Sequence, residues 1–327
     1  MPTPPPAPTT PPRSRPRPEP LLTVDDLRIS FGGTEAVRGV AFEVYAGEVL
    51  ALVGESGAGK SLTARALLGM APRAATVTGR VLLRGAPVTP ADLGRRVARI
   101  PQDAQSALSP VHRVEDQLAL AARSVRPLRR AEARALARRA LAEVGLGPEA
   151  AAARPHALSG GMRQRAVIAT ALVNGPELVV ADEPTTALDP ERRERILTLL
   201  RERCADAGAA LLLVSHDLEA VRRHADRVAV LHAGRLVELG PATRVLTRPA
   251  APYTRGLLAS LPTEDLPHRS RLPAPDGTPP LPGAPGCAFA PRCPRATDRC
   301  RAEEPEPRPV AGHRVACHHP YAEEEAA

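Results

Sequence analysis

The stretch GESGAGKS at residues 54–61 constrains the fold of this 327-residue chain more than any other feature. It follows the apolar run EVLALV and precedes a helical pattern at 59–70, which is the strand–loop–helix setting of a phosphate-binding loop. Glycines let the backbone N–H groups turn toward phosphate oxygens, and the helix N-terminus adds its positive dipole end. The predicted nucleotide-binding residues here are Gly54, Glu55, Ser56, Gly57, Ala58, Gly59, Lys60, Ser61 and Leu62.

Lys60 is the only lysine among the 44 basic residues of the chain. Its compact ammonium suits the β- and γ-phosphates of a nucleotide, whereas the planar guanidinium of arginine cannot take its place there. The neighbouring Ser61 offers a hydroxyl to Mg²⁺. The alternative interpretation is a glycine-rich turn between a strand and a helix that has no function. The strand–helix context and the single lysine both favour the phosphate-binding loop over this alternative.

A second motif, ELVVADEP at residues 177–184, is a buried-strand pattern that ends in two acids. Asp182 is predicted to hold Mg²⁺, directly or through water, and Glu183 to polarise the attacking water. Alone, such a pair could equally be a salt-bridged strand end. Beside a phosphate-binding loop the functional interpretation is favoured, because the metal of such a loop needs a carboxylate.

The rest of the chain predicts an α/β fold. Strand-like apolar runs fall at 22–30, 40–45, 48–53, 96–100, 177–181, 209–214 and 227–231, and helical patterns at 59–70 and 132–145. Strands that alternate with helices predict a largely parallel sheet. The stretch 103–157 has no convincing strand and predicts an inserted helical subdomain. Residues 228–239 predict a hairpin around Ala233-Gly234.

Composition sets the expected boundaries. Ten prolines in residues 1–20 predict a disordered tail, and eight more in 262–286 separate a domain at 21–261 from a C-terminal region at 262–327. No apolar run approaches the ~18–20 residues that span a bilayer. Arginines crowd residues 123–139, which is typical of a solvated helix face or of a surface near anionic lipid or an acidic partner.

At LSGGMRQR, residues 158–165, the chain resembles the ATPase subunits of ABC transporters. Other motifs fall in the order of that family: Gln102 in RIPQD matches the Q-loop, Ala187, Leu188 and Asp189 in TTALD match the D-loop, and His216 in LLLVSHD matches the switch histidine. Phe31 stands where the family places the aromatic ring that stacks on adenine. The resemblance implies a P-loop NTPase cassette with a RecA-like core, an antiparallel β subdomain and an inserted helical subdomain.

The resemblance also implies a mechanism. Two such ATPases sandwich two ATP molecules head to tail. The implied catalytic residues are Glu183, His216, Lys60 and Gln102, and the implied Mg²⁺ ligands are Ser61, Gln102 and Asp182. The signature residues Leu158, Ser159, Gly160, Gly161 and Gln164 would act on the partner's ATP, and Asp189 would belong to the D-loop between the two sites.

The C-terminal third resembles one branch of that family. PYTRGLLASLP at 252–262 and GCAFAPRCPRATDRC at 286–300 are similar to the oligopeptide and dipeptide importer ATPases, whose tail nickel importers share. This branch implies import of di- or oligopeptides. The implied partners are two permease subunits, a second ATPase in a heterodimer and an extracytoplasmic solute-binding protein. The implied location is the cytoplasmic face of the plasma membrane.

Two other functions stay open from the sequence. A nickel or other small-solute importer ATPase shares the same motifs. An ABC ATPase acting on nucleic acid or ribosomes is suggested by the net charge of +8, although the chain has only three Tyr, three Phe and no Trp with which to stack bases. We therefore expect no nucleic-acid partner.

Four cysteines gather near the C-terminus, at Cys287, Cys293, Cys300 and Cys317. Their spacing is wider than in common zinc sites and unlike ferredoxin runs, and some members of the branch carry an iron–sulfur cluster on such cysteines. A [4Fe–4S] cluster, a zinc ion or a set of reduced thiols all remain open. The fifth, Cys204, lies in an apolar helical pattern and is expected in the core.

Overall fold

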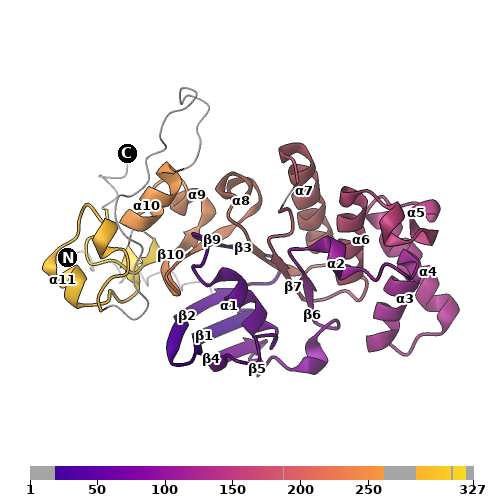
Figure 1. The fold of residues 1–327 in the computed structure, drawn as a ribbon, viewed down its shortest axis with the longest axis horizontal. Helices are drawn as coiled ribbons and strands as arrows, with labels where there is room; N and C mark the ends of the chain where they lie inside the picture. The colour runs from indigo at the N-terminus through magenta and orange to yellow at the C-terminus, as the bar shows by residue number, and fades with distance from the viewer. Residues whose placement is uncertain (1–18, 187, 261–284, 311, 322–327) are drawn as a thin grey trace, which may run out of the picture.

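A computed structural model describes residues 19–186, 188–260, 285–310 and 312–321 (Figure 1). Residues 1–18 of the tail predicted at 1–20, Ala187 and most of the proline-rich stretch after residue 261 lie outside the described residues.

The larger of the two described sheets carries the site. Its core strands are β3 (Val49–Val53), β6 (Val97–Ile100), β7 (Leu178–Asp182), β8 (Ala210–Val214) and β9 (Arg227–His232). They run parallel in the order β9-β3-β8-β7-β6, and β3, β7 and β8 are buried along their whole length. Burial on both faces explains the near-continuous apolar runs that predicted these strands.

The C-terminal region extends this sheet at its β9 edge. Strand β10 (Arg235–Pro241) pairs antiparallel with β9 around the predicted turn at Ala233-Gly234. The short strands β12 (His313–Val315) and β11 (Arg308–Val310) then continue the sheet outward. Gly240 makes this addition possible, because a Cβ there would lie 2.3 Å from the Cβ of His313 on β12.

A smaller antiparallel sheet packs against the first, in the order β2-β1-β4-β5. It consists of β1 (Leu22–Phe31), β2 (Thr34–Val44), β4 (Thr76–Leu83) and β5 (Ala86–Pro87). The prediction of a strand at 40–45 was too short, and β4 was missed. The first half of β4 is exposed and carries no apolar run, and it pairs closely with β1 because Gly79 has no side chain: a Cβ there would lie 2.3 Å from Asp26 O.

Helices α3 (Val114–Val125), α4 (Arg130–Glu143) and α5 (Pro148–Ala152) lie at the end of the molecule opposite α11 (Asp298–Ala302) (Figure 1). Helices α2 (Ala104–Ala107) and α6 (Gly160–Leu172) pack beside them. Between the two ends lie α1 (Lys60–Leu67), α7 (Pro190–Asp206), α8 (Leu218–His224), α9 (Ala242–Val245) and α10 (Pro252–Ala259). The stretch 103–157, where we expect a helical subdomain, thus contains α2, α3, α4 and α5.

Two arginines of α4 have structural roles. Arg134 pairs with Asp116 at 2.9 Å and Arg138 with Glu115 at 2.6 Å, which ties α4 to α3. Separately, none of the helices in the described parts of the chain is long and apolar enough to cross a membrane.

Candidate nucleotide site

The phosphate-binding loop joins the buried strand β3 to helix α1. Gly54 has a φ of +147°, and a Cβ there would lie 2.1 Å from the carbonyl oxygen of Leu231, so only glycine fits. Gly57 and Gly59 also have positive φ, and the N–H of Ala58 closes the turn on Glu55 O at 3.2 Å. Of the other predicted loop residues, Ser56 is exposed and Leu62 is half-buried against the core.

Lys60 is buried at the first position of α1. Its ammonium donates hydrogen bonds to two loop carbonyls, Gly54 O at 2.9 Å and Glu55 O at 3.0 Å. Burial lowers the pKa of this ammonium, while the carboxylates of Glu183, Asp182 and Glu55 act to raise it. Two carbonyl groups of the loop therefore hold the Lys60 ammonium in place.

Asp182, at the end of β7, contacts the start of α1 from another strand of the same sheet. Its Oδ1 accepts a 2.7 Å hydrogen bond from Ser61 Oγ. Its Oδ2 is buried and has no hydrogen-bond partner among the described residues. A buried carboxylate oxygen without a donor, next to a serine hydroxyl, fits the place of a divalent cation.

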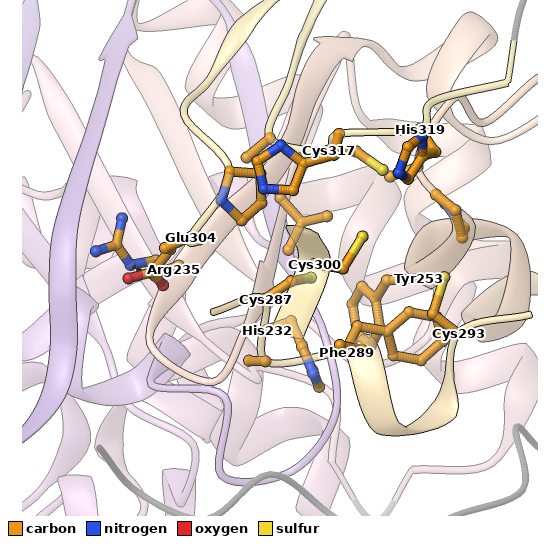
Figure 2. Close-up of a pocket in the computed structure, with 18 of the residues that line it drawn as sticks. His232, Arg235, Tyr253, Cys287, Phe289, Cys293, Cys300, Glu304, Cys317 and His319 are labelled. Atoms are coloured by element: carbon orange, nitrogen blue, oxygen red, sulfur yellow. Dashed lines mark ion pairs between the residues drawn. The ribbon is translucent and has the colours of Figure 1, made fainter. Parts of the chain in front are cut away.

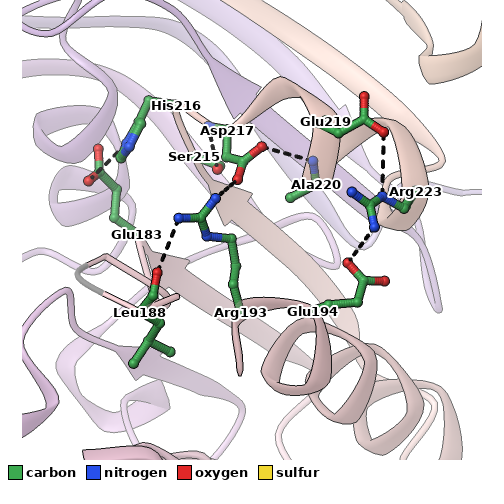
Figure 3. Close-up of polar contacts among 10 residues, drawn as sticks. All are labelled: Glu183, Leu188, Arg193, Glu194, Ser215, His216, Asp217, Glu219, Ala220 and Arg223. Atoms are coloured by element: carbon green, nitrogen blue, oxygen red, sulfur yellow. Dashed lines mark hydrogen bonds and ion pairs between the residues drawn. The ribbon is translucent and has the colours of Figure 1, made fainter. Parts of the chain in front are cut away.

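Glu183, the next residue along the chain, lies at the centre of a group of polar side chains. Its φ of +46° is unusual for a residue other than glycine and turns the side chain out of the strand end. Glu183 Oε2 accepts hydrogen bonds from Gln102 Nε2 at 3.3 Å and Thr186 Oγ1 at 3.0 Å, and lies 3.3 Å from His216 Nδ1 (Figure 3). The structure thus brings together Gln102, Glu183 and His216, which lie far apart in the sequence.

A second network, absent from the sequence prediction, lies behind this group (Figure 3). Arg193 on α7 donates to Leu188 O at 3.2 Å and pairs with Asp217, the residue that follows His216. Asp217 also caps α8 by accepting from Ala220 N at 3.0 Å, and Asp189 caps α7 by accepting from Arg192 N at 2.9 Å. Arg193 therefore connects the segment around Asp189 to the segment around His216.

The predicted signature residues are not gathered at this loop. Ser159 is exposed and caps α6, accepting from Met162 N at 3.3 Å, and Gly160 beside it is exposed as well. Leu158 and Gln164 are buried, and Gly161 is half-buried. Helix α6 packs against α2, α4 and α7, whereas α1 packs against β7 and β8. Phe31, the predicted adenine platform, lies half-buried at the end of β1.

The four C-terminal cysteines line one apolar hollow of about 50 Å³, which we call the cysteine pocket (Figure 2). Burial raises the pKa of Cys287, Cys293 and Cys317, the last to about 11. In the described part of the chain, no three His, Cys, Asp or Glu side chains are arranged to hold a metal ion. Cys204 lies buried in α7, as expected.

Comparison with known proteins agrees with this geometry. Residues 37–186 match the sequence profile of the ABC transporter family, and residues 237–300 match the oligopeptide/dipeptide transporter C-terminal region. The dipeptide transport ATP-binding protein DppD of Bacillus subtilis is 40% identical over 86% of this chain and 89% of its own length. The oligopeptide transport ATP-binding protein OppD of Escherichia coli is 38% identical over 93% of this chain and 94% of its own.

A mycobacterial relative is longer. The oligopeptide transport ATP-binding protein OppD of Mycobacterium tuberculosis is 44% identical over 91% of this chain, which spans 52% of that protein. Among solved structures, cbiO1 from Clostridium perfringens, part of an ABC transporter complex, has a TM-score of 0.60 at 27% identity, over 69% of this chain and 90% of its own. The cassette MJ0796, solved as a dimer with ADP and Pi, has a TM-score of 0.59 at 24% identity, over 68% of this chain and 98% of its own, and supports the fold alone.

The predicted fold class and the predicted family are thereby confirmed. With its phosphate loop, its acidic strand end and its C-terminal region all matched, the chain belongs to the family of ATP-binding proteins of oligopeptide and dipeptide ABC transporters.

Proposed function

We propose that this chain is the ATP-hydrolysing subunit of an ABC importer for di- or oligopeptides. The observation that carries the proposal is the arrangement around Glu183, whose carboxylate faces Gln102 and His216 beside the Ser61–Asp182 pair. A carboxylate in this position can orient and polarise a water for attack on the γ-phosphate, with His216 at hand to stabilise the charge that develops.

The other loop residues bind and orient the nucleotide. Backbone N–H groups of the loop and Lys60 hold the phosphates, which requires the Lys60 ammonium to exchange its two carbonyl partners for phosphate oxygens. Mg²⁺ would be held by Ser61, Asp182 and Gln102 and would neutralise charge on the β- and γ-phosphates. Phe31 would supply a face for the adenine ring.

The exposed signature segment supports a sandwich of two ATPases. Ser159 and Gly160 begin α6 at the surface, and α6 packs away from the phosphate loop of its own chain. We propose that Ser159 and Gly161 close over the ATP of a second ATPase, with Asp189 at the contact. That second ATPase is a different chain in the proposed heterodimer.

The helical end of the molecule supports contact with permeases. Val111 and Leu120 are exposed by 65% and 67% although both are apolar. Leu120 lines a hollow of about 250 Å³ together with His112, Asp116, Gln117, Arg123 and Arg130. An apolar surface of this kind, ringed by charges, fits a docking segment of a membrane protein. We propose two permease subunits, an extracytoplasmic solute-binding protein and a peripheral location on the cytoplasmic face of the membrane.

The first experiment measures ATP binding and hydrolysis by the purified chain and by Glu183→Gln. The amide keeps the shape of the carboxylate but cannot polarise water, so we expect retained ATP affinity and at least about a 100-fold loss of turnover. Glu191→Gln, an exposed acid on α7, is the matched control. Wild-type turnover in Glu183→Gln would contradict the mechanism.

The second experiment isolates the chain from native membranes. Recovery with two permeases, a second ATPase and a peptide-loaded binding protein would support the importer. Recovery with a nickel-loaded binding protein would instead indicate an importer of nickel or another small solute. Recovery with ribosomes or nucleic acid, with an affinity that falls steeply with salt, would favour the other class of function.

We also propose that the cysteine pocket holds an iron–sulfur cluster. The support for this proposal is that four cysteine thiols line one hollow. Iron–sulfur clusters are held by four cysteine thiolates. Anaerobic purification should give iron, acid-labile sulfide and a visible absorbance that Cys293→Ser reduces. A colourless, iron-free chain would contradict the cluster.

A further inference from the structure

The C-terminal segment reaches the phosphate loop at one residue, Glu55. This acid is the second residue of GESGAGKS, so its carboxylate lies in a loop that would bind a polyanion. Both of its oxygens are paired with Arg292, at 3.2 Å and 3.1 Å. Arg292 comes from 237 residues further along the chain, and its side chain is only 10% exposed.

Two further groups of Glu55 are engaged as well. Its N–H donates to the hydroxyl of Tyr253, a side chain that is fully buried, at 3.2 Å. Its carbonyl oxygen accepts from Lys60 Nζ at 3.0 Å. Tyr253 therefore holds the backbone of Glu55 and Arg292 holds its side chain, while the same residue contacts Lys60.

Aromatic rings pack together beside this contact. The rings of His232 and Tyr253 lie 4.1 Å apart and tilted by 32°, and Phe289 meets Tyr253 edge-on at 5.4 Å (Figure 2). Burial lowers the pKa of His232 to about 4, so this ring is a neutral packing surface at physiological pH. Arg292 ends the short turn Ala290–Arg292, and the adjoining Cys293 lines the cysteine pocket.

From these contacts we infer that Arg292 is a positioning residue of the nucleotide site: it neutralises Glu55 and holds the phosphate loop open to ATP. The inference rests on the proposed ATP function and deepens it. An unpaired carboxylate at Glu55 would repel the phosphates, and a bidentate guanidinium removes that charge while fixing its place. The C-terminal region is then part of the ATP site and not a separate appendage.

The test compares variants of the full chain by the Kd and KM for ATP. Arg292→Ala should raise both about three- to tenfold and leave kcat within about twofold, a modest range because Glu55 is 39% exposed and partly screened. Glu55→Gln removes the charge that would repel phosphate, and should lower the Kd for ATP. The double variant Glu55→Gln/Arg292→Ala should regain most of the affinity that Arg292→Ala loses, because no carboxylate remains to repel phosphate.

Controls separate charge from packing. Arg292→Lys keeps the charge and should lose less affinity than Arg292→Ala. Arg299→Ala, on α11 and 64% exposed, removes an arginine of the same region that does not touch the loop, and should leave KM unchanged. A double variant as weak as Arg292→Ala would overturn the inference and assign Arg292 to packing alone.

Failure of the inference is distinct from failure of the proposed function. A wild-type chain that hydrolyses ATP, with an Arg292→Ala variant of unchanged Kd and KM, would overturn this inference and leave the function standing. A wild-type chain that binds no ATP would overturn both.

Discussion

Ser61 Oγ donates a 2.7 Å hydrogen bond to Asp182 Oδ1 and so joins the start of α1 to the end of β7 across 121 residues of sequence. The two residues lie on different crossover units of one parallel sheet, and its topology places the carboxyl ends of β3 and β7 at the same edge. The Oδ2 of Asp182 is buried and has no hydrogen-bond partner among the described residues, which supports the proposal that this carboxylate holds Mg²⁺.

Asp182→Asn should therefore weaken Mg²⁺ binding more than ATP binding. The amide keeps the hydrogen bond to Ser61 but removes the charge, so we expect hydrolysis to fall about 100-fold at limiting Mg²⁺. Titration of hydrolysis with Mg²⁺ measures the effect. Asp206→Asn, a 64% exposed acid at the end of α7, serves as control. An unchanged Mg²⁺ requirement in Asp182→Asn would assign that acid a structural role.

Arg193→Ala should reduce turnover without changing ATP affinity. Arg193 holds Leu188 O and Asp217 together, and its loss frees the segment around Asp189 from the segment that carries His216. We expect about a tenfold loss of kcat with Kd for ATP within twofold, measured by steady-state hydrolysis and equilibrium binding. Arg195→Ala, which removes an exposed i,i+4 pair on the same helix, is the matched control. Equal activity in the two variants would contradict this link.

The sequence signals for the proposed nucleotide site are local. The phosphate loop, the acids at 182–183 and the apolar runs of β3, β7 and β8 each lie within ten residues, and each pattern has a direct physical cause. Their convergence follows from the topology of a parallel sheet. The roles of Gln102 and His216 carry no local signal and came only from the resemblance.

The missed features depend on contacts between distant residues. Strand β4 is half exposed and exists because Gly79 fits against Asp26. Tyr253 and Arg292 reach Glu55 from 198 and 237 residues away, and no periodicity in the sequence marks such a contact.

Because Cys204 is buried, the free energy of unfolding should fall as the pH rises above 9. Burial in α7 raises the pKa of its thiol to about 12 from 9.0, so the folded chain keeps the proton that the unfolded chain releases above pH 9. The stabilisation is complete below pH 9 and is lost as the pH rises toward 12. Between pH 8 and pH 10 the wild type should lose about 1 kcal/mol more unfolding free energy than Cys204→Ala.

Denaturant unfolding at the two pH values gives this difference. Leu200→Ala is the control, because it removes buried packing from the same helix but no titrating group, and should follow the pH dependence of the wild type. Identical pH dependence in Cys204→Ala and the wild type would show that the thiol does not titrate differently on unfolding.

Among the residues of the strands that extend the sheet, β10 to β12, substitution of Glu238 should lower the free energy of unfolding the most. Its side chain is fully buried on β10, accepts from Ala250 N at 2.8 Å and Ala251 N at 3.1 Å, and lies 2.8 Å from His313 Nε2 on β12. Glu238→Ala leaves two N–H groups and an imidazole buried without their acceptor, which costs about 3–5 kcal/mol. Glu238→Gln keeps an acceptor oxygen and should cost about half as much.

Chemical denaturation of the full chain tests this ranking. Glu202→Ala, an exposed acid on α7, should change the unfolding free energy by less than about 0.5 kcal/mol. Since β12 is short and pairs with β10 at Val315 and Arg314, loss of Glu238 should also release the segment that carries Cys317, and its thiol should then react faster with a soluble disulfide reagent. An unfolding free energy within 1 kcal/mol of the wild type would mean that the apolar contacts of Val315 alone hold the extension in place.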